Sequence, residues 1–165
     1  MRAENTQLLL EMLQQEWKLL QSAMQTLGQS AIKCAGITMK EEYTFEEQES
    51  FDSLTSKFNR TSDLFTQKII RTCWMLMHEP FVSFIDMMNL SEKIGMIDNA
   101  DKMIEIRDMR NQIAHEYIPE AIRDLVPEVI SLQEELISNI HKWHNFVYTR
   151  GRIKDWIYIH SIILS

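Results

Sequence analysis

The side chains best suited to chemistry lie together in one short stretch of the chain. Eleven residues hold two arginines, an asparagine, a histidine and a tyrosine: Arg107, Arg110, Asn111, His115 and Tyr117. A guanidinium binds phosphate oxygens through a fixed fork of N–H donors and neutralises charge as it builds in a phosphorane-like transition state. A histidine that titrates near neutral pH takes a proton from an RNA 2′-hydroxyl or gives one to the leaving oxygen. These residue types indicate phosphodiester chemistry that requires no metal.

The spacing of these residues limits how they could act together. Asn111 and His115 are four residues apart on one helix face, so Asn111 could orient the imidazole or donate to phosphate. Arg110 and Tyr117, seven apart, would also share a face. Arg110 and His115 are five apart and point about 140° away from each other in a straight helix. Both reach one phosphate only if the helix frays or kinks, or if a second copy of the chain contributes.

A plain structural interpretation is open at this point. A histidine at the end of a helix often satisfies the last carbonyl groups, and Arg110 could form surface ion pairs with Glu105 or Asp108. On that interpretation the chain is an ordinary helical bundle and a monomer in solution.

A family resemblance adds to the residue chemistry. Arg110-Asn111-Gln112-Ile113-Ala114-His115 resembles the R-N-x-x-x-H signature of HEPN domains, with the polar residue that this family prefers directly after the arginine. The string extends to Tyr117 and is then similar to the HepT branch of the family. The stretch 51–76 and the run Gly95-Met-Ile-Asp before the motif also resemble that branch, so the resemblance covers most of residues 1–150.

The resemblance implies a HEPN-like bundle that forms a homodimer, with two Arg/His pairs in a shared cleft. It implies a ribonuclease toxin that cleaves RNA without metal or other cofactor, with His115 as general acid or base, Arg110 as phosphate and transition-state stabiliser, and Asn111 in support. The implied partner is a MntA-type minimal nucleotidyltransferase antitoxin, which silences the toxin by AMPylation of the motif tyrosine, here Tyr117. A bulky anionic nucleotide at Tyr117 would fill the cleft and neutralise its positive charge.

Two further hypotheses stay beside this one. Similar proteins are also described as non-catalytic, substrate-binding subunits of a nucleotidyltransferase, which would share the fold and the partner but would not cleave RNA. His141 and His144 are three residues apart on a helix, a spacing that could bind a metal. Because Glu134 and Glu135 give no third ligand at a convincing offset, we expect no metal site there.

Apolar periodicity predicts the helices that must position the motif. The first spans about residues 5–34, with apolar side chains at three- and four-residue steps. Thr44 and Glu47 form a capping-box signature that starts a second helix, which continues to about Glu79 before Pro80. Residues 81–97 are expected to form short broken helices.

The motif lies near the end of the third main helix. Asp98-Asn99 offers caps for its start, and it should end before Pro119 because a proline disfavours helical conformation at the residue before it, Ile118. A fourth helix is expected from about Pro119 to Gly151, and residues 156–164 could add a fifth. The prediction is an all-α, up-and-down bundle of four to five helices in one domain, 1–165, with a short C-terminal extension at 151–165.

Composition and charge bound the class of protein. Four Gly and three Pro in 165 residues favour helices, and a net charge of −7 argues against non-specific coating of nucleic acid without excluding a local basic site. No apolar run of eighteen residues occurs, and charged residues interrupt any signal-peptide core near the N-terminus. Cys34 and Cys73 are expected to be buried thiols in a reducing compartment. We therefore predict a cytoplasmic protein that makes no membrane contact.

Overall fold

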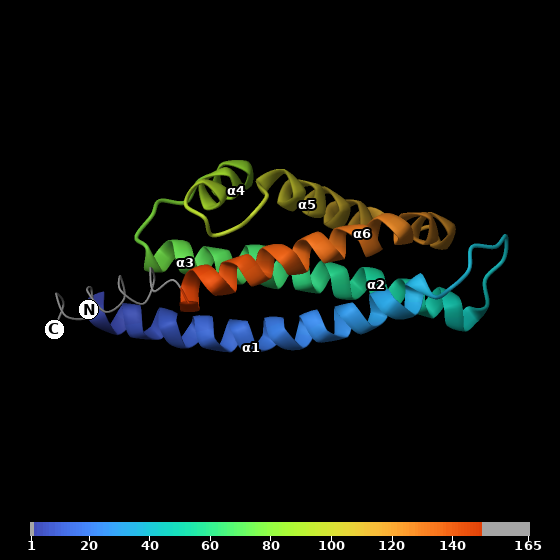
Figure 1. Cartoon of the computed structure of the whole chain (residues 1–165), viewed down its shortest axis with the longest axis horizontal. Coiled ribbons are helices and arrows are strands. Elements are labelled where there is room, and N and C mark those ends of the chain that lie inside the picture. Colours follow the sequence, from blue (N-terminus) through green and yellow to red (C-terminus); the bar gives the residue numbers. More distant parts are fainter. Residues whose placement is uncertain (1, 150–165) are drawn as a thin grey trace.

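Two long antiparallel helical rods form the base of the molecule (Figure 1). In the computed structural model, which describes residues 2–149, the first rod is α1 (Arg2–Ala35). The second combines α2 (Phe45–Asp63), the π-helical segment η1 (Leu64–Ile69) and α3 (Ile70–Leu76). These bounds confirm the first two predicted helices, although the π-helical segment was not expected from the sequence.

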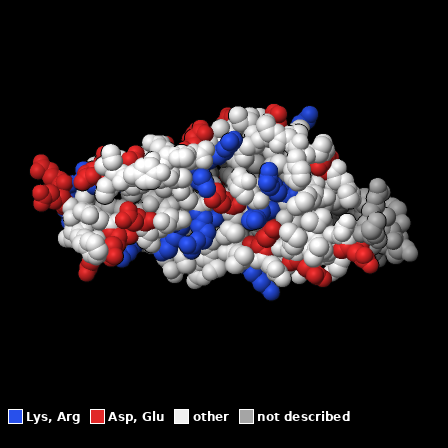
Figure 2. Space-filling view, turned by 180° about the vertical axis from the view of Figure 1, so that it is seen from behind, with Lys and Arg blue, Asp and Glu red and all other residues white. Residues whose placement is uncertain are grey.

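Three further helices complete the bundle. The short α4 (Phe84–Lys93) precedes α5 (Ala100–His115), and α6 (Pro119–His144) runs back antiparallel to α5 over the first two rods (Figure 1). A second π-helical segment, η2 (Asn145–Thr149), continues α6. Every regular element within residues 2–149 is helical, which confirms the predicted all-α bundle. The surface mixes charges of both signs, as Figure 2 shows for the face opposite to that of Figure 1.

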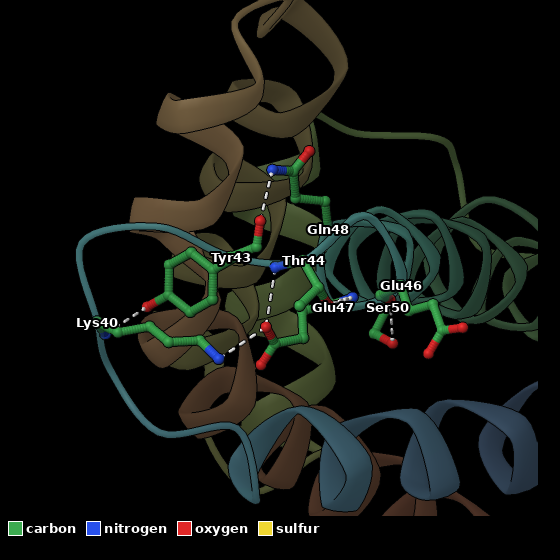
Figure 3. A network of polar contacts seen from close by, with 7 residues as sticks. All are labelled: Lys40, Tyr43, Thr44, Glu46, Glu47, Gln48 and Ser50. Carbon is green, nitrogen blue, oxygen red and sulfur yellow. Dashed lines mark hydrogen bonds and ion pairs between the residues drawn. The ribbon is translucent and has the colours of Figure 1, made fainter.

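The predicted capping box starts α2. The Glu47 backbone N–H donates to Thr44 Oγ1 at 3.1 Å, and the Thr44 backbone N–H donates to Glu47 Oε1 at 2.9 Å (Figure 3). Lys40 pairs with the same Glu47 carboxylate at 2.8 Å, and its hydrogen bond is the main reason that the pKa of Glu47 lies below its usual value. Glu47, one of six acidic residues between positions 41 and 52, therefore stabilises the start of α2.

The second rod ends slightly earlier than predicted, in a C-terminal cap of the Schellman type. His78 has a positive φ of 55°, and the Glu79 N–H donates to the Trp74 carbonyl at 3.1 Å. The helix α4 ends in the same way. Gly95 has a φ of 85°, and the Met96 N–H donates to the Ser91 carbonyl at 2.8 Å. The expectation of several short helices in 81–97 is wrong in number, because the stretch between these two caps holds the single helix α4.

The core lies where α1, the second rod and α6 meet. Phe58, Phe65 and Trp143 are fully buried, and the Trp143 indole N–H donates to Cys73 Sγ at 3.3 Å. Both thiols are buried as predicted, and burial raises the pKa of Cys73 to about 12. This core packs the second rod against α1 and α6.

The start of α5 is anchored by a buried asparagine of α6. Asn139 Oδ1 accepts the backbone N–H groups of Asp98 and Asn99 at 3.0 and 3.1 Å, while its Nδ2 donates to the Glu135 carbonyl at 2.8 Å. Asn99 in turn caps α5 by accepting the Lys102 N–H at 3.1 Å. The predicted cap is thus confirmed, and a tertiary contact fixes where α5 begins.

Two expectations concern parts of the chain at or beyond the described residues. The predicted extension at 151–165 and the helix expected at 156–164 lie outside them. Within residues 2–149, no helix is long and apolar enough to cross a membrane.

Candidate functional site

The side chain of the motif arginine, Arg110, lines a pocket between α5 and the second rod. The pocket has a volume of about 710 Å³. Arg107, Arg110 and Asn111 face it from α5, because residues three and four apart share one helix face. The opposite wall comes from the end of α2 and from η1: Arg60, Ser62, Asp63, Leu64, Thr66, Gln67 and Lys68. Two of the predicted site residues, Arg110 and Asn111, are therefore brought together in a concave site.

A carboxylate holds the Arg110 guanidinium in a fixed orientation. Arg110 Nε donates to Asp63 Oδ1 and Arg110 Nη2 donates to Asp63 Oδ2, both at 2.9 Å. Arg110 Nη1 also lies 3.5 Å from Asn111 Oδ1. The hydrogen bond to Asp63 raises the pKa of Arg110. Because a guanidinium has five N–H donors, this arrangement leaves two donors on Nη1 and Nη2 for a further acceptor.

The backbone of Arg110 is held as well. Asn59 Nδ2, on α2, donates to the Arg110 carbonyl at 3.3 Å. The α2 residues Asn59 and Asp63 are four apart, so one face of α2 contacts both the main chain and the side chain of Arg110. This double contact positions the motif arginine against the second rod.

The pocket is locally basic on an acidic chain. Among the described residues, four cations line it against one carboxylate, that of Asp63, whereas the whole chain carries a formal charge of −7; the cations are Arg60, Lys68, Arg107 and Arg110. Within the described part of the chain, Arg60 and Lys68 form no ion pair within 4 Å. Lys and Arg side chains gather in the middle of the face seen in Figure 2. Such a site attracts anions locally although the chain as a whole repels them.

Arg107 belongs to this basic group and also contacts α4. Its guanidinium lies 4.5 Å from the centre of the Phe84 ring, a cation–π arrangement. The contact ties the α4 side of the bundle to the pocket. Arg107 therefore keeps its charge at the rim, next to Arg110.

The π-helical segment forms one wall of the pocket. In its wider turn the Ile70 backbone N–H donates a hydrogen bond to the Phe65 carbonyl, five residues earlier. The Thr66 hydroxyl donates to the Ser62 carbonyl at 2.8 Å. π-helical turns inside α-helices occur frequently at functional sites. Neither this segment nor Asp63 was predicted as part of the site, although the spacing of the polar residues Asn59, Arg60 and Asp63 near the end of the predicted helix was a usable signal.

His115 lies apart from the pocket. It is the last residue of α5, is exposed, and does not line the pocket. Because α5 is helical without interruption up to His115, no kink or frayed turn brings the imidazole round to Arg110, and the separation of about 140° about the helix axis persists. One chain therefore does not assemble Arg110 and His115 at a single point.

The motif tyrosine lies beyond the helix. Glu116 has extended backbone angles, and its Oε1 accepts the backbone N–H groups of Tyr117 and Ile118 at 3.1 Å each. The expectation that Tyr117 shares a helix face with Arg110 is wrong, because α5 ends at His115 ahead of Pro119. Tyr117 is 86% exposed, so its hydroxyl is open to a modifying enzyme.

Arg110 and His144 both have partners that the sequence did not indicate. Arg110 pairs across the bundle with Asp63 rather than along its own helix with Glu105 or Asp108.

His144 stacks on Trp17 with ring centres 4.7 Å apart, and burial, followed by the nearby His141, lowers the pKa of His144. Among the described residues, no three His, Cys, Asp or Glu side chains come together as a metal site.

Comparisons with known proteins do not extend this picture. No protein-family model, no curated protein and no solved structure matches the chain. The motif and the geometry around it therefore carry the functional proposal.

Proposed function

We propose that this chain is a metal-independent ribonuclease of the HEPN type, acting as a toxin in the cytoplasm. The observation that carries the proposal is the basic pocket centred on Arg110 in a chain with a net charge of −7. A locally concentrated set of cations beside a pre-oriented arginine suits a phosphodiester that gains negative charge in its transition state. The motif resemblance supplies the reaction class, and the pocket supports the choice of RNA as substrate.

In the proposed reaction the 2′-hydroxyl of RNA is the nucleophile. The neutral imidazole of His115 accepts the hydroxyl proton, and the 2′-oxygen attacks the adjacent phosphorus. The bond from phosphorus to the 5′-oxygen breaks, and the same His115, now protonated, gives the leaving oxygen its proton. The products are a 2′,3′-cyclic phosphate and a 5′-hydroxyl. Arg110 binds the non-bridging oxygens through its two remaining donors, and Asn111 supports it.

The proposal requires a homodimer. Arg110 and His115 point apart on the uninterrupted α5, so one chain offers the phosphate-binding group and another the imidazole. A twofold arrangement would then create two equivalent sites in one cleft. The exposed side chains of Tyr117 and Ile118, which follow the motif directly, are available for such a contact.

The proposed regulator is a MntA-type nucleotidyltransferase that AMPylates Tyr117. The nucleotide would add a phosphodiester charge and considerable bulk close to the end of α5. That charge would compete with RNA for the same cations, and its bulk would interfere with the second chain. The exposure of Tyr117 supports access by such an enzyme.

One observation favours a second candidate, the non-catalytic subunit that only binds a nucleotidyltransferase. The Nε and Nη2 donors of Arg110 are both bonded to Asp63. This pair of donors is one of those through which arginine can bind a phosphate with two hydrogen bonds. If the pair is permanent, Arg110 serves to hold α5 on α2 rather than to bind RNA. The two candidates differ in one measurable property, RNA cleavage by the isolated protein.

The test compares wild type with an Arg110→Ala/His115→Ala variant on total cellular RNA in EDTA. An Arg71→Ala/His141→Ala variant is the matched control, because both of its positions are exposed and lie outside the pocket. We expect cleavage by wild type and control, ending in cyclic phosphates, and none by the motif variant. Absence of cleavage by protein with unmodified Tyr117 would support the binding subunit. Equal cleavage by all three proteins would refute the site.

A further inference from the structure

The basic pocket extends well beyond the atoms needed to hold one cleaved phosphate. Its volume of about 710 Å³ is in the range of sites for small organic ligands. It reaches from Asn111 on α5 to Arg60 and Lys68 on the second rod, and His115 does not line it. The motif accounts for Arg110 and Asn111, but it gives no role to the two cations on the opposite wall.

The π-helical segment aligns these two cations. Arg60 and Lys68 are eight residues apart, which in a regular α-helix would place them about 80° apart around the axis. The π-helical segment between them accommodates one extra residue, which reduces this angle to about 20°. Both side chains are exposed and line the same pocket. The irregular turn thus creates a pair of cations on one face.

The charges of this pair are not neutralised by ion pairs. No acidic side chain lies within 4 Å of either cation in the described part of the chain, and the single pocket carboxylate, Asp63, is engaged by Arg110. Lys68 interacts at longer range with the buried Glu16 of α1, and a phosphate of the ligand would add the close-range partner that both cations lack among the described residues. Lys and Arg side chains that neutralise phosphates release counterions, which gives binding a strong dependence on salt.

The remaining wall suits a nucleobase. Leu64 offers an apolar surface, while Gln67 and Asn111 carry amide groups that both donate and accept hydrogen bonds. The Thr66 hydroxyl is already bonded to the Ser62 carbonyl and does not compete for the ligand. Bases reach such a pocket when they are unpaired and turned out of a stack, as in single-stranded RNA.

We propose that the pocket between α5 and η1 binds the nucleotide next to the cleaved bond of single-stranded RNA, with Arg60 and Lys68 as its phosphate-binding residues. This assignment rests on the proposed function, since it takes RNA as the substrate and Arg110 as the neighbouring group. It adds a subsite outside the motif and gives the π-helical segment a role. The same phosphate chemistry is offered by a free nucleotide, which the test distinguishes.

The test measures binding of an uncleavable RNA, so it does not depend on catalysis. A fluorescent 2′-O-methyl oligonucleotide of about six residues is titrated with wild type and with Arg60→Gln/Lys68→Gln, at salt between about 50 and 200 mM. The control, Lys33→Gln/Lys57→Gln, removes the same charge from a separate groove between α1 and α2. Thermal unfolding of each variant checks that the exposed substitutions leave the fold intact.

We expect the pocket variant to bind about 10- to 100-fold more weakly at low salt. Its slope of log affinity against log salt should be smaller by about 1.4, the value for two lost contacts to a single strand. The control variant should remain within about threefold of wild type. Equal losses in the two variants would attribute binding to overall charge and would overturn the subsite. AMP that competes at the affinity of the oligonucleotide would also overturn it, in favour of a free-nucleotide site.

A cleavage assay separates this proposal from the proposed function. If wild type cleaves RNA and the pocket variant binds and cleaves as well as wild type, the subsite is wrong and the ribonuclease stands. If no protein cleaves but the pocket variant alone loses RNA binding, the pocket is an RNA-binding site without an adjacent cleaved bond, and the ribonuclease is wrong. If both proposals hold, the variant should show a raised KM and an unchanged kcat.

Discussion

Replacing Asp63 by asparagine is expected to separate RNA binding from RNA cleavage. Asp63 accepts two hydrogen bonds from Arg110, each of 2.9 Å, and is the one carboxylate in the pocket. The amide side chain of the variant would keep the size of the carboxylate but lose its charge and one of the two acceptor atoms. The pocket would become more positive, while Arg110 would be held less firmly. Binding and catalysis should therefore change in opposite directions.

The magnitude follows from Coulomb's law. A phosphate about 6 Å from a carboxylate is repelled by about 0.7 kcal/mol in water and by about 2.8 kcal/mol at an effective dielectric constant of about 20. Because the Asp63 side chain is 39% exposed, the lower part of this range applies. We expect RNA to bind about fivefold more tightly, which corresponds to about 1 kcal/mol. Loss of the fixed Arg110 geometry should lower kcat about 10- to 100-fold.

The effect on folding should be small. The side chains of the pair are 34% and 39% exposed, so solvent screens it, and its loss should lower the free energy of unfolding by about 0.5–1 kcal/mol. The assay is steady-state cleavage of a short fluorescent RNA, with Asp108→Asn as a control of equal charge change outside the pocket. We expect a lower KM and a lower kcat for Asp63→Asn alone. A raised KM with unchanged kcat would show that Asp63 neither repels the RNA phosphate nor orients Arg110 for catalysis.

Three further predictions concern stability and reactivity. Asn139→Leu leaves two backbone N–H groups before α5 unpaired and should lower the free energy of unfolding in urea by about 2–4 kcal/mol; a loss below about 0.5 kcal/mol would contradict this anchor. Burial raises the pKa of Glu16, whose carboxyl group accepts a hydrogen bond from the Thr72 hydroxyl. The contribution of Glu16 to stability is therefore present at low pH and is lost as pH rises through the raised pKa. Glu16→Gln should therefore raise Tm relative to wild type by about 2–4 °C near pH 8 and by almost nothing near pH 4; a pH-independent difference would contradict the argument. Cys34 and Cys73 should resist alkylation near pH 8 until the protein unfolds, the latter about a thousandfold relative to an exposed thiol because its pKa is raised to about 12; rapid labelling of the native protein would contradict their burial.

Much of the helical framework was predictable because its signals are local. The Thr44–Glu47 capping box and the Asn99 cap each depend on side chains within three residues of the helix start. Ile118 adopts an extended conformation, with φ −95° and ψ 118°, because the proline after it disfavours the helical region. Such interactions are encoded within a single turn and can be seen in the sequence alone.

The details of the site were less predictable because they depend on contacts between distant segments. Arg110 and Asp63 are 47 residues apart, and nothing in the spacing of either indicates that they meet. The sequence instead favoured partners on the same helix, since those distances are fixed by helix geometry. The π-helical segment was also missed, because an apolar pattern does not distinguish it from a regular α-helix over so few residues.

Mixing two inactive variants tests whether Arg110 of one chain and His115 of another form a single ribonuclease site. Arg110→Ala and His115→Ala are each assayed on RNA in EDTA, and then after equal amounts have exchanged subunits. In a mixed dimer, the intact Arg110 and the intact His115 lie on different chains and restore one of two sites. Since half of the dimers are mixed, we expect about a quarter of wild-type activity. A mixture as inactive as its components would contradict a site shared between chains, and activity in either variant alone would contradict the assignment of these residues.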